Sequence, residues 1–343
     1  MNLKSLFFYL SIAVSSLSNP LLINRNALHA DVLFFGNNAN TFAIDFIEIA
    51  DPGNAADSVG FPNPAGSVGY RYGIGKYEVS ESMISSYNAE YGTSNAQTIT
   101  TNNRGPNKPA TLVSWKDAAR FVNWLNTSTG GFAAYKLDSS GNAALWSAAD
   151  TSDYDSTNPV RSRRARFVLP SVNEWHKAAY YDPATDSWYY YPNGSNSPPT
   201  AVASGTAPGT EVFNQPAVGS VPADVTQAGG PNPNGLVAMG GNVTEWGEPI
   251  SFHLFPGSGA VQRGANWLDD GSAMHSTAFD ETATTSDANF AVGFRVVMLL
   301  SAVPEPQLAA FVFVISVGTA WLLRRSQIHR RRTTESLRNS PTL

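Results

Sequence analysis

The 343-residue chain contains no cysteine. A chain without thiols forms no disulfide bond, offers no thiolate to a metal ion and has no cysteine nucleophile. Histidine is also scarce, and between residues 31 and 306 only His176, His253 and His275 occur. No two of these form a His-x-x-x-His pair, so the sequence excludes a helical two-histidine metal centre. A Gly-x-Ser-x-Gly elbow and a phosphate-binding glycine loop are missing as well.

Charged side chains make up only 14% of the chain, and the positive ones are the rarer. Residues 31–306 contain 14 lysines and arginines against 26 aspartates and glutamates, a net charge of −12. Nucleic acids and anionic membrane surfaces attract basic faces, so this acidic region predicts no nucleic-acid partner. Its length of about 275 residues is enough to bury a full hydrophobic core.

One long apolar run lies near the N-terminus, over residues 6–14, directly after Lys4. Small and polar residues follow, and Leu28-His29-Ala30 fits a signal-peptidase cleavage site. The run is too short to span a bilayer, so residues 1–30 are predicted to form a secretory signal peptide with Asp31 as the mature start. The alternative is a buried first helix, although the polar stretch 15–26 would bury poorly.

The other long apolar run, residues 308–323, lies near the C-terminus and carries no charge. As a helix it would reach about 24 Å, against about 30 Å of hydrocarbon, and flanking arginines can snorkel across the difference. The residues that frame this run are Pro304, Glu305 and Pro306 before it, and Arg324, Arg325 and Arg330–Arg332 after it. Arginines keep their end of a membrane helix on the cytoplasmic side, which places the preceding chain outside.

A Pro-Glu-Pro motif, a short apolar helix and an arginine-rich tail in this order resemble the PEP-CTERM sorting signal of Gram-negative bacteria. The resemblance implies recognition by an exosortase-type transpeptidase, with cleavage near the motif. We therefore expect a sorting signal over residues 302–332, a cytoplasmic tail over 333–343, and a helix that holds the protein in the membrane before processing. The folded body is then exported to the outer face of the membrane, the cell envelope or the extracellular matrix.

Local patterns predict an α+β fold with many loops. A strand is expected over Phe42–Ile47 and another over Tyr70–Val79, after which Ser80 begins a helix towards Tyr91. A helix over Ser114–Asn126 has Ser114 as its N-cap, and a further helix starts at Ser171, where Glu174 completes a capping box. Residues 182–234 are expected to form long loops of the same domain, with strand-like segments resuming at Leu236, Val261 and Ala291.

Seven short segments follow one another in a characteristic order. They are Tyr77–Ser80, Val113–Ala118, Leu169–Trp175, Pro233–Leu236, Gly241–Trp246, Arg263–Trp267 and Gly293–Arg295. The series resembles the formylglycine-generating enzyme, or sulfatase-modifying factor, family over residues 70–298. The resemblance implies a loop-rich, C-type-lectin-like fold, with residues 31–69 as an N-terminal extension.

Several residues of these segments have a structural interpretation that needs no chemistry. Trp115, Trp175, Trp246 and Trp267 are expected to pack in the core. Arg295, next to a phenylalanine, is expected to be a buried and paired arginine. The segments therefore predict a fold first, and function has to be argued from the site.

Catalytic members of the resembled family oxidise a substrate cysteine with a copper ion held by two enzyme cysteines. Here the first thiolate position falls near Asp269, within Gly264–Gly271. Copper(I) needs soft sulfur ligands, so no copper is expected. Asp269 and Asp270 are weak catalytic candidates, with a solvated acidic turn as the alternative.

The resemblance also implies calcium. In one family site, a side chain three residues before the Gly-Asn pair, backbone carbonyls and a glutamate hold the ion. Glu245 matches that glutamate, Gly241 and Val243 match the carbonyls, and Ala238 stands where an oxygen ligand is expected. A six-to-eight-ligand shell tolerates one loss, so a weakened calcium site is predicted, with pairing of Glu245 to an arginine as the alternative. For the second family site only Asn214 is a weak match.

Three functions are compatible with these observations, and one of them, a sorting cargo with a scaffold role alone, predicts neither a ligand nor an enzymatic activity. The second is a non-catalytic binding or structural module of the cell surface, with a polysaccharide or surface ligand, because loop-rich folds of this kind suit recognition. The third is an enzyme of the same family with cysteine-independent, metal-assisted oxidoreductase-type chemistry at perturbed carboxylates. Within the loops, the aromatic run Trp188–Tyr191 could stack on sugar rings or cover the core as a strand.

Overall fold

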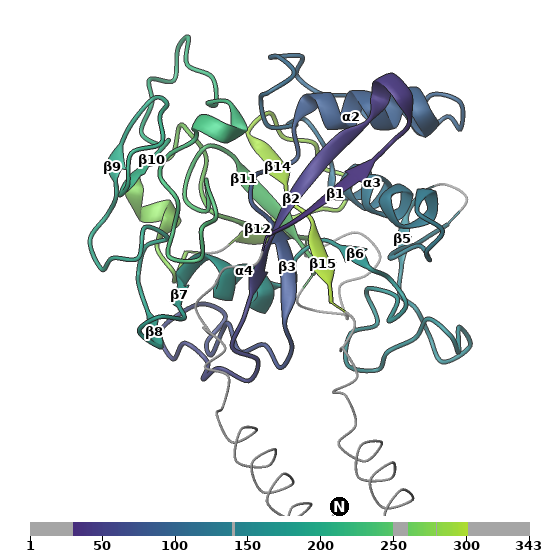
Figure 1. Cartoon of the computed structure of the whole chain (residues 1–343), viewed down its shortest axis with the longest axis horizontal. Helices are drawn as coiled ribbons and strands as arrows, with labels where there is room; N and C mark the ends of the chain where they lie inside the picture. The colour runs from purple at the N-terminus through teal and green to yellow at the C-terminus, as the bar shows by residue number, and fades with distance from the viewer. Residues whose placement is uncertain (1–29, 139–140, 250–259, 279, 301–343) are drawn as a thin grey trace, which may run out of the picture. The chain divides into compact units, whose positions relative to one another are not determined.

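The computed structural model describes residues 30–138, 141–249, 260–278 and 280–300, which build two main sheets (Figure 1). The first sheet has five strands in the order β1, β2, β3, β15 and β6, all paired antiparallel. Their bounds are Ala30–Phe35, Phe42–Ile49, Tyr72–Gly75, Val297–Leu299 and Phe167–Val168. The last described strand thus lies between two strands from earlier parts of the chain.

The second sheet has four strands in the order β13, β12, β11 and β14. Their bounds are Asp280–Ala283, Ala260–Arg263, Thr244–Gly247 and Val292–Phe294. β11 pairs antiparallel with β12 and parallel with β14. Three small ladders lie in the long connections: β4 (Lys136–Leu137) with β5 (Ala143–Ala144), β7 (Tyr181–Asp182) with β8 (Ser187–Trp188), and β9 (Thr200–Ala201) with β10 (Thr210–Glu211).

The α-helices begin at the predicted capping residues. Ser80 caps α2 (Glu81–Tyr87), which runs on into the π-helical turn η2 (Asn88–Gly92). Ser114 and Ser171 each form a capping box, at α3 (Trp115–Ser128) and α4 (Val172–Tyr180). Short 3-10 helices complete the set: η1 (Asn38–Asn40), η3 (Val225–Gln227) and η5 (Gly271–Met274).

The main hydrophobic core lies where α3 meets the two main sheets. Phe121 of α3 contacts Phe294 at 5.6 Å and Phe42 at 6.2 Å between ring centroids. Phe167 of β6 contacts Phe35 and Phe46 of the neighbouring strands. The four tryptophans predicted to be core residues are each at most 2% exposed, which confirms that prediction.

Two predicted strands differ from the structure. The strand expected over Tyr70–Val79 is only Tyr72–Gly75 long, and Leu236 does not begin a strand. Leu236 instead closes a turn, because its amide donates to Oδ1 of Asn232 and its carbonyl accepts from the Asn232 amide. The Asn232 side chain also donates to the Ala178 carbonyl at the end of α4. Helix capping thus determines the conformation of this segment.

Within the described parts of residues 30–300, none of the helices has the length and hydrophobicity needed to cross a bilayer. Most residues of the predicted signal peptide, the Pro304–Pro306 motif, the apolar run 308–323 and the arginines after it lie outside the described residues. His253 lies outside them as well. The predicted extension 31–69 is part of the folded domain, since it contributes β1 and β2 to the first sheet.

Candidate functional site

The loop after β12 contains Asp269, near which the resemblance implies the first copper thiolate of the family. It starts at Gly264, which has a φ of +99° and lies so close to Trp175 that a Cβ would sit 3.0 Å from the ring. The Gly264 carbonyl accepts a 2.6 Å hydrogen bond from the amide of Gly241. Only glycine tolerates both the backbone conformation and the close approach, so the start of this loop is fixed against α4.

Asp269 lies in the following turn and stabilises it. Its Oδ2 accepts hydrogen bonds from the backbone amide of Asn266 at 2.9 Å and from its side-chain amide at 2.6 Å. Burial raises the pKa of the Asp269 carboxyl. The Asp269 carbonyl accepts from the amide of Asn214 at 2.8 Å, while the Asn214 side chain is exposed. The structure thus brings these two predicted residues together through the backbone.

Asp270 has a different role from its neighbour. Its Oδ1 accepts from the amide of Ser272 at 2.8 Å and also from that residue's hydroxyl, so it caps η5. These hydrogen bonds lower the pKa of Asp270. The two aspartates therefore do not form a carboxylate pair, because each is used within its own turn.

A cavity of ≈ 360 Å³ opens beside this loop. Apart from Arg263 and Asp269, the polar side chains that line it are uncharged: Thr244, Gln262, Asn266 and Asn289. Amides and hydroxyls both donate and accept hydrogen bonds. The cavity therefore suits a ligand with many hydroxyl or amide groups better than one that needs a strong acid or nucleophile.

Glu245 is buried in a close ion pair with Arg295. The Arg295 Nε donates to both carboxylate oxygens at 2.8 and 2.7 Å, and its Nη2 donates to Oε1 at 2.5 Å. Trp175 Nε1 adds a further bond to Oε2 at 2.8 Å. The guanidinium also donates to the carbonyls of Val237 and Ala238, at 3.1 Å each. The buried and paired arginine predicted from the sequence is confirmed.

These contacts bear directly on the predicted calcium site. The Glu245 oxygens already accept from Arg295 and Trp175. Val243 donates its amide to Glu78, which does not involve the carbonyl that was predicted as a ligand. Among the described residues, no group of three or more His, Asp or Glu side chains is arranged to hold a metal ion. The residues therefore do not fit a calcium ion, since the guanidinium already fills the space between Glu245 and the Ala238 carbonyl. Calcium stays a prediction that this geometry does not support.

The family is shown by a match that covers most of the chain. The model of the sulfatase-modifying factor enzyme 1-like domain matches residues 48–300. The chain belongs to this family. The match starts within β2, so part of the first sheet lies ahead of it.

Solved structures support the same fold for this sulfatase-modifying-factor-like protein. Treponema denticola variable protein 1 is 18% identical, with a TM-score of 0.51 over 78% of this chain and 99% of that chain. CarF is 19% identical, with a TM-score of 0.53 over 75% of this chain and 99% of that chain. At such identities the likeness concerns the fold alone. No curated protein matches the sequence.

Two further buried carboxylates surround Arg295, and the sequence-based reasoning did not identify them. Glu78 accepts from Asn242 Nδ2 at 2.7 Å, and burial together with the negative Glu245 raises its pKa to about 8. Burial holds the pKa of Glu211 well above its usual range, and its Oε2 has no hydrogen-bond partner among the described residues. Glu78 lies in the family segment Tyr77–Ser80, and this position was the one feature of the sequence that could have pointed to it.

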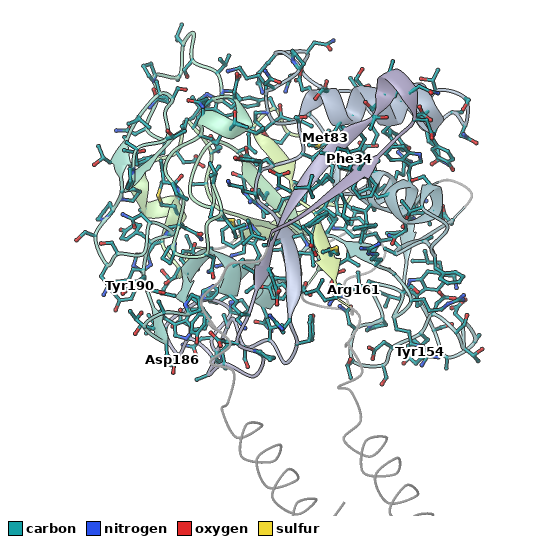
Figure 2. The ribbon with its side chains drawn as sticks, in the orientation of Figure 1. Phe34, Met83, Tyr154, Arg161, Asp186 and Tyr190 are labelled. Carbon is teal, nitrogen blue, oxygen red and sulfur yellow. The ribbon has the colours of Figure 1, made fainter. Side chains whose placement is uncertain are left out.

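The aromatic run Trp188–Tyr191 is divided between core and surface. Trp188 packs against His176 and Tyr181, at 5.4 and 5.1 Å between ring centroids. Tyr190 lies at the edge of the domain (Figure 2), is 39% exposed and stacks on His275 at 4.9 Å. Trp188 of β8 therefore covers the core, as one alternative expected, whereas stacking of the exposed Tyr190 on a sugar ring stays a prediction.

Proposed function

We propose that this sulfatase-modifying-factor-like protein is a non-catalytic binding module of the cell surface or exopolysaccharide. The observation that carries the proposal is the state of Asp269. At the family's thiolate position stands a carboxylate whose Oδ2 is bonded twice to Asn266 of its own turn. Copper(I) requires soft ligands that this chain does not contain. A cavity with hydrogen-bonding walls lies beside Asp269.

The composition of the cavity and its surroundings favours a carbohydrate as ligand. Thr244, Gln262 and Asn289 offer donors and acceptors for sugar hydroxyls. His275 lies near the cavity, because Ala273 and Ala278, on either side of it in the sequence, line the cavity. Tyr190 is held next to this segment by a hydrogen bond from the Ser276 amide to the Tyr190 carbonyl. An exposed aromatic ring beside a polar cavity is a common arrangement for holding a sugar ring.

Export and sorting form part of the same proposal. The N-terminal apolar run and the motif formed by Pro304, Glu305 and Pro306 support delivery outside the cytoplasm and processing by an exosortase-type transpeptidase. The acidic charge of residues 31–306 supports a neutral or cationic partner over nucleic acid. The membrane helix then serves as a temporary sorting device.

Glycan-array binding by the protein isolated from the envelope of producing cells tests the proposal. Tyr190→Ala is expected to weaken binding about tenfold, equivalent to about 1.4 kcal/mol, because the ring contact is lost. Phe34→Ala is the matched control. Phe34 is 70% exposed on β1 of the first sheet, whereas the strands that line the cavity belong to the second sheet. Equal effects of the two substitutions, or no glycan bound, contradict the proposal. In the same preparation, mass spectrometry should find a C-terminus near Pro306, and retained Arg324 contradicts the sorting step.

The rival function is an enzyme with cysteine-independent, metal-assisted oxidoreductase chemistry. It is favoured by one observation, the raised pKa of Asp269 beside a cavity. Asp269→Asn separates the two functions, because it keeps the shape of the turn and removes the carboxylate. Loss of a turnover activity with intact glycan binding supports the enzyme, whereas unchanged glycan binding with no turnover in either protein supports the module.

A further inference from the structure

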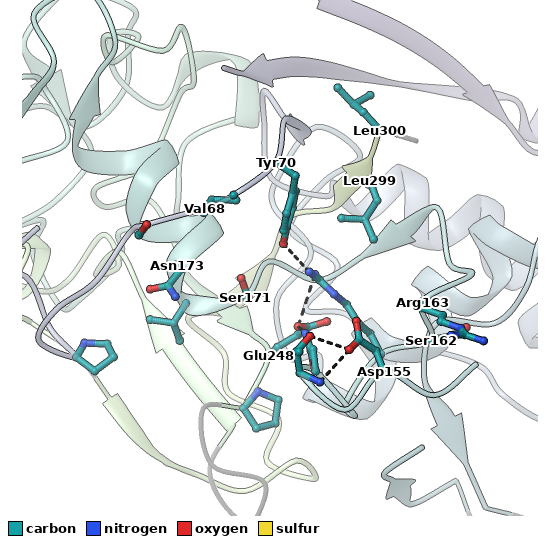
Figure 3. Close-up of a pocket in the computed structure, with 18 of the residues that line it drawn as sticks. Val68, Tyr70, Asp155, Ser162, Arg163, Ser171, Asn173, Glu248, Leu299 and Leu300 are labelled. Carbon is teal, nitrogen blue, oxygen red and sulfur yellow. Dashed lines mark hydrogen bonds and ion pairs between the residues drawn. The ribbon is translucent and has the colours of Figure 1, made fainter. Parts of the chain in front are cut away.

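A second cavity, of ≈ 770 Å³, shares no residue with the one beside Asp269. Figure 3 shows its lining, which comes from residues 62–70 and 155–163, from the start of α4, from Glu248 directly after β11 and from the end of β15. Tyr70 reaches into it from one side, while Leu299 and Leu300 form an apolar wall. Nothing in the proposed glycan face depends on this cavity.

The floor of this cavity contains a buried arginine whose donors are largely used. The two terminal nitrogens of Arg161 donate to the two oxygens of Glu174, at 3.0 Å each. Nη2 also donates to the hydroxyl of Tyr70 at 2.8 Å. Arg161 is only 8% exposed. An anionic ligand would therefore compete with a bidentate carboxylate, which disfavours anions here.

Glu248 is the second carboxylate on this floor, and it shares the same arginine. Its Oε2 lies 3.6 Å from Arg161 Nη1 and accepts from Asn158 Nδ2 at 3.0 Å. Its Oε1 accepts from the hydroxyl of Tyr135 at 2.8 Å. A carboxylate has about four acceptor positions, so Glu248 keeps acceptor capacity. It lines the cavity although it is only 2% exposed.

One guanidinium thus faces two buried carboxylates, which leaves the floor with an excess of negative charge when both are ionised. At the rim, Asp155 adds a further carboxylate. Arg163 also lines the rim and keeps its positive charge, but its guanidinium is exposed, donates to the carbonyls of Thr151 and Ser152 and forms no ion pair with Asp155 in the part of the chain that the structure describes. Buried charge of one sign is costly unless a partner of the opposite sign is present.

We propose that this cavity binds a ligand through a primary ammonium or guanidinium group that Glu248 accepts. The ring of Tyr70, which is 41% exposed, and the side chain of Leu299 provide an apolar surface for the carbon skeleton that carries the cation. Two sources share this chemistry, a lysine or arginine side chain of a peptide and an amino sugar.

Binding of a cation is expected to depend on pH with a defined sign. Burial raises the pKa of Glu248, Glu174 adds to this, and Arg161 opposes it. Tyr135 and Asn158 donate to the same carboxyl, and Asp155 is the other acid at the rim. A cation favours the ionised carboxylate, so binding releases a proton. Affinity should therefore rise with pH, by up to about tenfold per pH unit, until the pKa of Glu248 in the free protein is passed.

Isothermal titration calorimetry with the purified full-length protein tests the proposal. The probes are a lysine-containing peptide and glucosamine, and the controls are the acetyl-lysine peptide and N-acetylglucosamine, which lack the cation. At least one cationic probe should bind ten times more tightly than its acetylated form, and the difference between peptide and sugar identifies the source. The pH series uses the lysine peptide, whose ammonium stays charged throughout.

Two substitutions link the binding to this cavity. Glu248→Gln keeps the shape, and it should abolish both the preference for the cation and the pH dependence. Asp155→Asn, at the partly exposed rim, should weaken binding severalfold and leave the pH dependence in place; it serves if Glu248→Gln fails to fold. Equal affinity for cationic and acetylated probes, or binding that Glu248→Gln leaves unchanged, overturns the proposal. Glycan binding at the Tyr190 face should survive both substitutions, so failure of either proposal can be recognised separately.

Discussion

Arg295 is the residue around which the buried polar groups of the second sheet are arranged. It has no exposed surface, and three buried glutamates, Glu245, Glu78 and Glu211, raise its pKa although burial opposes the charge. Removing one member of a buried ion pair leaves an uncompensated charge, which costs more than the pair contributes. Arg295 is thus the cation that offsets the negative charge of all three carboxylates.

Arg295→Met is expected to lower the free energy of unfolding by about 3–5 kcal/mol, because Glu245 loses its partner inside the core. Glu245→Gln should cost less, since Glu78 can then ionise beside the arginine; its pKa is raised to about 8, partly by Glu245. Urea unfolding measures both. Lys108→Met is the control, because it removes a partly exposed pair with Asp224 worth about 0–1 kcal/mol. A cost of Arg295→Met as small as that of the control contradicts this account.

The sequence predicted the state of some site residues and missed others for a physical reason. Burial of Arg295 was predicted because it follows a phenylalanine within the family segment Gly293–Arg295. The contacts of Glu78 and of Arg161 were not predicted, since they depend on partners brought together by folding. Glu78 meets Asn242 across 164 positions, and Tyr135 meets Glu248 across 113. Hydrophobic patterns within one element carry no information about such pairs.

At the scale of elements, α3 and α4 begin in the same way but have different surroundings. Both have a serine N-cap and an acidic residue three positions later. In α3 that acid, Asp117, pairs with the partly exposed Arg120 of the same helix. In α4 it is Glu174, which is fully buried and holds Arg161. The capping box therefore only starts the helix in α3. In α4 the same motif starts the helix and also forms a tertiary ion pair.

Glu174→Gln should therefore destabilise the protein more than Asp117→Asn. The expected losses are about 1.5–3 kcal/mol for Glu174→Gln, which removes the bidentate partner of Arg161 and leaves it only Glu248, 3.6 Å from its Nη1. About 1 kcal/mol is expected for Asp117→Asn, which weakens a cap. Chemical denaturation followed by tryptophan fluorescence gives both values. Similar losses in the two variants would show that Glu174 acts only as a capping residue.

The starts of the helices were predictable because a cap depends on residues only three positions apart. Leu236 shows the limit of the same reasoning. Its apolar neighbours favour a strand, yet Asn232 and Asn234 bind carbonyls at the end of α4 and turn the chain. Those carbonyls lie more than fifty positions away. A local pattern is overridden wherever a distant helix end needs hydrogen-bond donors.

At the scale of the whole molecule, the first sheet joins the beginning and the end of the described chain. β2 lies between β1 and β3, and β15 pairs with β3 on its other side. The buried side chains of β2 are Ile44, Phe46, Ile47 and Ile49, each at most 6% exposed. The family match, which starts at residue 48, includes only the last of these. The sheet therefore extends the family domain towards the N-terminus.

A truncated protein that begins at residue 70 is consequently expected not to fold, whereas one that begins at residue 31 should melt cooperatively. Each buried side chain of β2 contributes about 1.5–3 kcal/mol, so losing four removes about 6–12 kcal/mol, which is comparable to the whole 5–15 kcal/mol that typically stabilises a domain. A third protein, beginning at residue 41, keeps β2 and loses β1 and η1. Val32 and Phe34 of β1 are exposed and, of the side chains that the structure describes in this strand, only Phe35 is buried in the core, so this protein should fold with a lower melting temperature. Circular dichroism and thermal melting distinguish the three. A cooperative transition in the protein that begins at residue 70 would show that residues 31–69 are an appendage to a domain that is complete without them.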